Sequence, residues 1–232
     1  MTPAKASELK LIAGGSLAGL LREIGPQFET ASGYTLSIHF DSTPNIISRI
    51  NAGTPFDVVV VPADVFKDAS AKRHLAGPIV SIARVGFGVV VRAGAPKPDL
   101  STPDCFKKAL LAASSVASTP ESAAGAYIAK VYQRLGIAEQ MKAKTRVQTM
   151  PTSIAPAVAR GEAELGIFLT NVFHMPGVEL AGLFPADLQQ ELMFPAAVAA
   201  DASDAAAANA LIDFLKTPAA VAAIKAVGMT PA

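Results

Sequence analysis

The chain of 232 residues contains no tryptophan, three tyrosines and one cysteine. The single cysteine, Cys105, excludes an internal disulfide and any paired-cysteine metal or redox motif. The shortage of large aromatic residues argues against a stacking platform for sugar rings. No run of 18 apolar residues occurs, so the sequence holds no segment typical of a membrane-spanning helix.

An excess of either charge is also missing, because 20 Lys and Arg stand against 19 Asp and Glu. The basic residues are scattered and no nucleic-acid-binding motif appears, so we expect no nucleic-acid partner. The three histidines and the cysteine lack metal-ligand spacing, and no nucleotide-binding loop or nucleophile elbow occurs. We therefore expect neither a metal nor a cofactor.

Apolar residues, by contrast, make up 51% of the chain, enough for a sizeable core. In the first third, strand patterns alternate with helix patterns. The predicted strands are 9–13, 34–40 and 57–62, and the predicted helices are 16–31, 43–53 and 63–74. This order predicts an α/β fold with a parallel sheet between layers of helices.

A second strand-and-helix block follows in the middle of the chain. Two long extended segments, 79–94 and 192–200, stand on either side of it and are longer than a typical strand. They fit a two-strand hinge, which predicts one lobe from 1–83 plus 196–232 and another from 84–195. The alternative is a single, continuous doubly wound sheet.

Hydroxyl side chains stand at four predicted strand-to-helix turns. They are Ser16 in the first turn, Ser42 and Thr43 in the second, Ser122 in the third, and Thr152 and Ser153 in the fourth. Helix starts offer unpaired N–H groups and the positive end of the helix dipole, and hydroxyls add neutral donors. The four turns together predict an anion site, although for any one hydroxyl taken alone helix capping is the better explanation.

Several segments, running almost end to end, carry a family resemblance. They are "AGGSLAGLL", "FDSTPNIISRINAGTPFDVVVVPAD", "AGAYIAKVYQRLGI", "AVARGEAELGI" and "FLKTPAAVAAIKAVGM". Their order and spacing resemble the molybdate-binding-protein-like branch of the type II periplasmic solute-binding proteins. The resemblance implies two α/β lobes, a two-strand hinge and a ligand in the cleft between the lobes.

The resemblance also implies ligand contacts at particular positions. The family's first serine maps to Ser16 and its second to Thr43, with Ser42 beside it. Its backbone contacts map to Ala124 and Gly125 and to 151–153, where Pro151 removes a donor. At the position of the family's tyrosine this sequence has Leu169, so that hydroxyl is absent. These two departures favour a different anion, such as an organic carboxylate, with Arg84 as its cation or else as a hinge ion pair.

The resemblance further implies a periplasmic protein that hands a small anionic ligand to an inner-membrane ABC transporter permease. We expect a monomer. The N-terminal "MTPAKASELK" lacks the apolar core of a signal peptide, so we expect that such a peptide has been removed from this sequence. If the native gene has none, a cytosolic anion sensor is the alternative.

One protein type similar to this branch is an aconitate isomerase, which makes a periplasmic isomerase of a tricarboxylic acid the rival function. Proton transfer would need a base near the ligand. The candidates are His39, Asp41, Asp64 and His174, of which His39 and Asp41 stand next to the second turn. The alternative role of Asp41 is only to orient that turn. If the protein is only a binder, none of these residues is catalytic.

Overall fold

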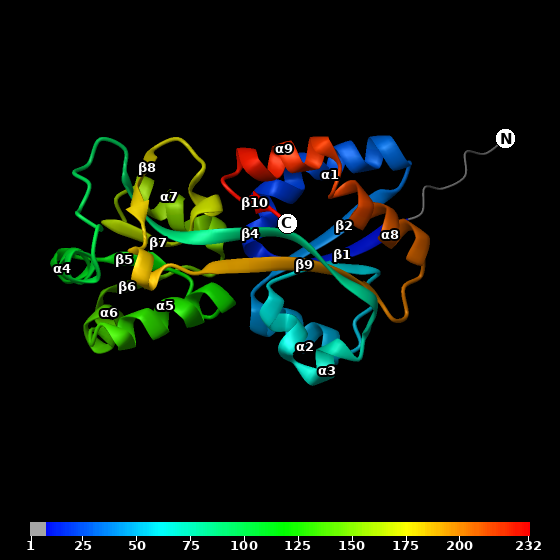
Figure 1. The fold of residues 1–232 in the computed structure, drawn as a ribbon, viewed down its shortest axis with the longest axis horizontal. Coiled ribbons are helices and arrows are strands. Elements are labelled where there is room, and N and C mark those ends of the chain that lie inside the picture. The colour runs from blue at the N-terminus through cyan, green and yellow to red at the C-terminus, as the bar shows by residue number, and fades with distance from the viewer. Residues whose placement is uncertain (1–7) are drawn as a thin grey trace. The chain divides into compact units, whose positions relative to one another are not determined.

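The computed structural model describes residues 8–232, and the polar leader at 1–7 lies outside the described residues. The chain packs into two compact units, each a sheet with helices (Figure 1). The described part of unit 1 runs to Arg84 and adds Met193–Ala226 and Thr230–Ala232, whereas unit 2 comprises Val85–Leu192 and Val227–Met229. The sequence predicted that the chain passes from one lobe to the other after residue 83 and returns after residue 195.

Unit 1 begins with strands and helices in alternation. In chain order they are β1 (Glu8–Gly14), the 3-10 helix η1 (Gly15–Leu17), α1 (Ala18–Ser32), β2 (Thr35–Asp41), α2 (Thr43–Asn51), β3 (Val58–Val60), η2 (Ala63–Lys67) and α3 (Ala69–Lys72). The C-terminal part adds α8 (Ala205–Phe214), α9 (Pro218–Ala226) and β10 (Thr230–Pro231). Two long strands, β4 (Leu75–Arg92) and β9 (Glu191–Ala199), contribute residues to both units.

The sheet of unit 1 has the strand order β2-β1-β3-β9-β4, and β10 pairs with β4. Helices α1, α8 and α9 lie on one face, and α2 and α3 lie on the other (Figure 1). Strand β1 is parallel to β2 and β3, as predicted, but β9 is antiparallel to β3. Strand β9 runs the other way because it brings the chain back from unit 2.

The core of unit 1 follows from the apolar faces of its elements. Ile46 and Ile50 of α2 pack against Val59 and Val61, with all four side chains buried. On the opposite face, the ring of Phe28 meets that of Phe214 edge-on at 5.5 Å. These contacts fix the helices over the sheet and so fix the turns that lead from strand to helix.

A buried carboxylate ties unit 1 together where β3 begins. Asp57 accepts hydrogen bonds from Lys10 N–H at 2.8 Å and from the Ser203 N–H and hydroxyl at 2.7 Å each. Burial raises the pKa of this carboxyl, but the hydrogen bonds outweigh that effect and hold it below its ordinary value. Asp57 thereby joins β1 to the segment just before α8.

Unit 2 contains the middle of the chain. Its elements are α4 (Pro103–Ala112), β5 (Val116–Ser118), α5 (Ala123–Arg134), α6 (Ala138–Lys144), β6 (Thr145–Val147), η3 (Pro151–Ser153), α7 (Ile154–Ala159), β7 (Leu165–Leu169), η4 (Thr170–Phe173), β8 (Val178–Leu183) and η5 (Ala186–Leu188). The strand order is β8-β4-β7-β5-β6, with β5 parallel to both neighbours and β4 antiparallel to both of its own.

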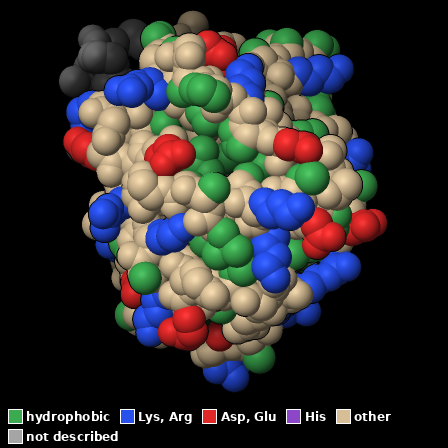
Figure 2. Space-filling model, turned by 90° about the vertical axis from the view of Figure 1, so that its left-hand side faces the viewer, with side chains coloured by type: hydrophobic (Ala, Val, Ile, Leu, Met, Phe, Trp, Pro, Cys, Tyr) green, Lys and Arg blue, Asp and Glu red, His purple; other side chains and the backbone are tan. Residues whose placement is uncertain are grey.

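Helices α5 and α6 lie on one face of this sheet and α7 lies on the other (Figure 1). Aromatic rings fill part of the core, where Phe184 lies 5.3 Å from Phe87 and 4.9 Å from Phe106 between ring centroids. On the outer face of unit 2, Lys and Arg are intermingled with Asp and Glu, and apolar side chains gather in a hollow (Figure 2). This face therefore carries no patch of a single charge.

Two predicted helices differ from the structure. The segment 63–74 is a 3-10 helix followed by one short α-helix, because the Asp68 side chain accepts from Ala71 N–H and starts a new helix there. The helix predicted to start at the fourth turn, near Thr152 and Ser153, opens with a 3-10 turn, η3.

Within residues 8–232 no single helix is long and apolar enough to cross a membrane. Only α8 and α9 taken together, with a bend of 62° between them, meet that test of length and composition.

Candidate functional site

The first predicted turn lies at the carboxyl end of β1 in unit 1. Ser16 sits in η1, is 8% exposed, and precedes α1, which begins at Ala18. The chain passes close to its neighbours here, because a Cβ added to Gly14 would meet Pro62 Cδ at 3.0 Å. The glycine thus lets the backbone of this turn approach the turn that follows β3.

The second turn lies beside the first. Gly14 and Asp41 are register partners of the parallel strands β1 and β2, so both turns leave the same end of the sheet. Ser42 is the first residue before α2 and has extended backbone angles, but its side chain makes no capping hydrogen bond. Thr43 follows it and is 8% exposed. The structure thus brings Ser16, Ser42 and Thr43 to one edge of unit 1.

Asp41 organises this second turn in place of the serine. Its Oδ1 accepts hydrogen bonds from Ser42 N–H at 2.8 Å and from Asn45 Nδ2 at 2.7 Å. From the sequence, Asp41 was a candidate either for a base or for a residue that only orients this turn, and the hydrogen bonds show that it orients the turn; Asn45 was not predicted as its partner. An Asp four residues before an Asn at a helix start is the signal that could have predicted the pair.

A histidine completes this group. His39 Nε2 lies 3.2 Å from Asp41 Oδ2, and the histidine side chain is 41% exposed. Burial raises the pKa of the Asp41 carboxyl, but hydrogen bonds from Asn45, Ser42 N–H and His39 outweigh it and hold the pKa below its ordinary value. Asp41 is therefore ionised at neutral pH.

That ionised carboxylate has two chemical consequences at the turn. An imidazole held by a carboxylate is an arrangement suited to a general base. The same negative charge disfavours a second bare anion nearby unless neutral donors compensate for it. The turn is therefore not a purely attractive anion site.

The third turn, in unit 2, uses its hydroxyl differently. Ser122 Oγ accepts from Gly125 N–H at 2.9 Å and donates to the Thr119 carbonyl at 2.8 Å. The Gly125 amide and the Ser122 hydroxyl, both predicted to bind the ligand, are thus committed to the helix cap. Ligand contacts at Ser122, Ala124 and Gly125 stay predictions, and at Ser122 and Gly125 they compete with these cap hydrogen bonds.

Gly125 is required by packing. A Cβ at this position would overlap the carbonyl oxygens of Thr119 and Pro120. The loop after β5 therefore lies directly against the first turn of α5.

The fourth turn, also in unit 2, is the weakest helix start. Thr152 and Ser153 lie in or at the end of η3, and α7 after them has six residues. Such a short helix contributes little dipole. Pro151 is buried, and as a proline it offers no N–H to a ligand.

The remaining candidates lie on other elements than these four turns. Arg84 is in β4, where it pairs with Thr230 of β10. Asp64 forms an exposed ion pair with Lys67 at 2.8 Å, and His174 follows η4 in unit 2. Leu169, at the position of the family's tyrosine, is fully buried at the end of β7. The ligand cleft between two lobes stays a prediction.

Comparison with known proteins places this geometry in a family. The profile of the bacterial extracellular solute-binding proteins matches residues 9–230. An aconitate isomerase from a Pseudomonas species is 33% identical over 96% of this chain and 87% of that protein. The molybdate-binding protein of Azotobacter vinelandii is 29% identical over 97% of this chain and 90% of that protein.

A solved structure supports the same placement. The periplasmic molybdate-binding protein of Azotobacter vinelandii matches with a TM-score of 0.78 and 21% identity, and the match covers 96% of this chain and 98% of that one. The two chains share a fold. The predicted fold class, an α/β protein of the two-lobe binding-protein type, is thereby confirmed, as is the resemblance to molybdate-binding proteins.

Proposed function

Because the chain belongs to the bacterial extracellular solute-binding protein family, we propose that it captures a small anion through its strand-to-helix turns. The observation that carries this proposal is the pair of turns at the carboxyl ends of β1 and β2. They bring the hydroxyl-bearing residues Ser16, Ser42 and Thr43, with the amides of two helix starts, to one edge of unit 1. Neutral donors of this kind hold anions without a lysine or arginine.

An organic carboxylate or a tetrahedral oxyanion fits these donors. Asp41 favours a ligand that brings hydrogen-bond donors of its own or reaches His39, because a bare oxyanion would meet the carboxylate charge. Pro151 and Leu169 also remove two contacts that molybdate binders of the resembled family use. The loss of these two contacts ranks di- and tricarboxylates before molybdate.

Titration calorimetry tests the proposal. Molybdate, tungstate, sulfate and a series of di- and tricarboxylates are titrated into the wild-type protein, and the tightest ligand into Ser16→Ala. We expect Ser16→Ala to weaken binding about tenfold or more, through the loss of a sheltered hydrogen bond to a charged group. Ser48→Ala, on the middle of α2, is the control. Unchanged affinity in Ser16→Ala would refute the proposed site.

The family membership supports a finer role as the periplasmic component of an ABC importer, acting as a monomer. Closure around the ligand would give the permease a form to recognise. Ligand uptake by vesicles containing the permease, with and without added protein, measures that role. Uptake that is independent of the protein would contradict it, and sedimentation reports the oligomeric state.

The His39–Asp41 pair favours a second candidate, an isomerase of a tricarboxylic acid. His39 would remove a proton from a methylene group next to a ligand carboxylate and return it to the far end of the allylic anion. Asp41 would hold the imidazole and stabilise its protonated form. The 33% identity to an aconitate isomerase supports this candidate.

Proton NMR in D₂O separates the two functions. The protein is incubated with cis-aconitate and with trans-aconitate, and both interconversion and deuterium uptake are followed. An isomerase gives both signals in the wild type, loses them in His39→Gln, and keeps ligand binding in that variant. Tight binding of either acid without turnover would leave the protein as a binder only.

A further inference from the structure

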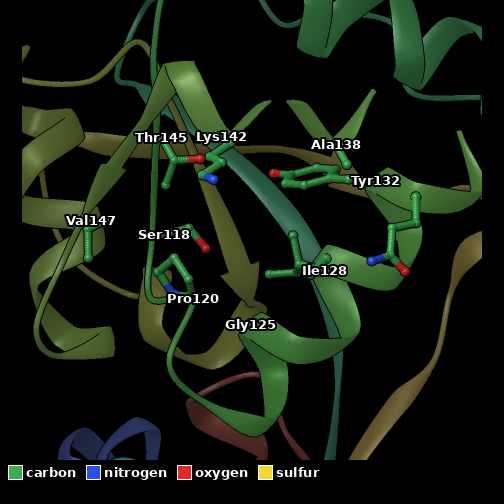
Figure 3. Close-up of a pocket in the computed structure, with 11 residues that line it drawn as sticks. Ser118, Pro120, Gly125, Ile128, Tyr132, Ala138, Lys142, Thr145 and Val147 are labelled. Carbon is green, nitrogen blue, oxygen red and sulfur yellow. The ribbon is translucent and has the colours of Figure 1, made fainter. Parts of the chain in front are cut away.

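Unit 2 contains a cavity of about 250 Å³ whose wall includes Gly125 of the third turn and is otherwise made of residues outside the predicted ligand contacts. It lies between α5, α6 and the ends of β5 and β6 (Figure 3). Most of its wall is apolar and comes from Pro120, Ile128, Ala129, Ala138 and Val147. Val147 is 66% exposed and lines the same cavity.

One polar group in the cavity is buried without a partner. The Tyr132 side chain is only 8% exposed, and its hydroxyl oxygen makes no hydrogen bond to any described residue. Burial raises the pKa of this phenol, so it keeps its proton and remains a donor. A buried hydroxyl without a partner is unfavourable, and a ligand that accepts its hydrogen bond would remove that penalty.

The other polar groups that line the cavity determine which ligand groups it can bind. The Ser118 hydroxyl already donates to the Ile167 carbonyl at 3.2 Å, and the Thr145 hydroxyl donates to the Met141 carbonyl at 2.7 Å. Lys142 lines the same cavity and pairs with no carboxylate among the described residues. Figure 3 shows the Tyr132 oxygen pointing toward the side of the cavity occupied by Lys142 and Thr145.

We propose that this cavity binds a small monocarboxylate with a compact apolar body. The carboxylate accepts hydrogen bonds from the Tyr132 hydroxyl and the Lys142 ammonium, and the apolar body lies against Pro120, Ile128 and Val147. An apolar cavity of about 150 Å³ holds a benzene ring, so this volume suits roughly ten non-hydrogen atoms. The site belongs to unit 2 alone and does not depend on the anion proposed for the helix-start turns.

Hexanoate, at eight non-hydrogen atoms, is the probe, and two-dimensional ¹H–¹⁵N NMR of the full chain is the measurement. We expect saturable shifts in the amides of Ile128, Tyr132 and Val147 at hexanoate concentrations up to about 10 mM. 1-Hexanol, which has the same body without the charge, should bind more weakly. Butanoate should also bind more weakly, because it covers less of the apolar wall.

Two variants with matched controls assign the polar contacts. Tyr132→Phe removes one hydrogen bond and should raise the dissociation constant about fivefold, and Lys142→Gln should raise it about tenfold. Tyr127→Phe on the same helix, whose hydroxyl donates to the Leu188 carbonyl, should leave it unchanged. Lys130→Gln, also on α5, is the control for charge.

Melting temperatures separate a loss of binding from a loss of folding in these variants. Because the Tyr132 hydroxyl has no partner, Tyr132→Phe should fold with an unchanged or higher melting temperature. The proposal is overturned if hexanoate gives no saturable shifts, or if the shifts spread over exposed lysines remote from the cavity. An unchanged dissociation constant in Tyr132→Phe would overturn it as well.

Discussion

The turns that begin α2 and α5 both place a serine before a helix, yet they use it differently. In unit 2, Ser122 caps α5 with its own hydroxyl and engages the Gly125 amide. In unit 1, Asp41 supplies the acceptor instead, and the Ser42 side chain makes no capping bond. A serine at a helix start therefore does not by itself indicate a donor available to a ligand. A neighbouring carboxylate that accepts the amide hydrogen bond, as Asp41 does, leaves the serine hydroxyl without a capping role. The same carboxylate adds a negative charge to the turn.

The largest effect should come from the tightest part of the α5 turn. In Gly125→Ala the new methyl group would overlap the carbonyl oxygens of Thr119 and Pro120, so the turn must move. We expect a loss of about 2–3 kcal/mol in the free energy of unfolding, measured by urea denaturation. Gly19→Ala in α1, where nothing lies within 4 Å, should gain about 0.5 kcal/mol. Equal changes in the free energy of unfolding at the two sites would contradict the close approach of Gly125 to the Thr119 and Pro120 carbonyls.

Next in size is the loss of the carboxylate that holds the α2 turn. Asp41→Ala removes the acceptor for Ser42 N–H and Asn45, and should lower the free energy of unfolding by about 1–2 kcal/mol at pH 7. Asp64→Ala, at an exposed ion pair, should change it by less than about 0.5 kcal/mol.

The effect of Asp41 should also depend on pH. The pKa of its carboxyl is lower in the folded protein than its ordinary value of 3.8. Its stabilising contribution is therefore fully present above pH 3.8 and is lost as pH falls through the folded-state pKa. The difference between wild type and Asp41→Ala should narrow in acid, and a constant difference would show that the ionised form is not what stabilises the turn.

A smaller effect should follow from removing the α5 cap. Ser122→Ala leaves the Gly125 amide without its acceptor and should cost about 1 kcal/mol. Ser122→Asp, which keeps an acceptor at the same position, should restore most of that stability. Thermal denaturation measures both variants, and failure of the aspartate to restore stability would point to a role for the Thr119 contact instead.

The smallest effect should be at the corresponding serine of unit 1. Ser42→Ala should leave the free energy of unfolding within about 0.5 kcal/mol of wild type, because this hydroxyl does not cap α2. Its effect should appear in anion affinity, measured by calorimetry. A destabilisation equal to that of Ser122→Ala would remove the difference between the two turns.

The sequence predicted the early elements of unit 1 because their patterns are strong and local. Alternation marked β2, a valine run marked β3, and Pro44 after a hydroxyl pair marked the start of α2. Helix α6 was not predicted because only Met141 of its residues is buried, which leaves no apolar period to detect. The antiparallel direction of β9 depends on the return from unit 2 and has no local signal.

The candidate site was predicted as a set of positions, not as a set of hydrogen bonds. Hydroxyls at turns are visible in the sequence, and Ser16, Ser42 and Thr43 do lie at one edge of unit 1. Whether a given hydroxyl caps its helix is decided by side-chain rotamers and by neighbours such as Asp41. The cavity beside Tyr132 had no sequence signal, because its walls come from separate elements whose residues look like ordinary core.

The position of β9 has a consequence for how the protein is made. This strand inserts between β3 and β4 in the sheet of unit 1, yet it is synthesised only after residues 85–190. Until then the nascent chain exposes an unpaired valine-rich edge at β3, the kind of edge that recruits other chains into aggregates. The sheet begun by the first third of the chain is therefore completed only when about the last fifth has been synthesised.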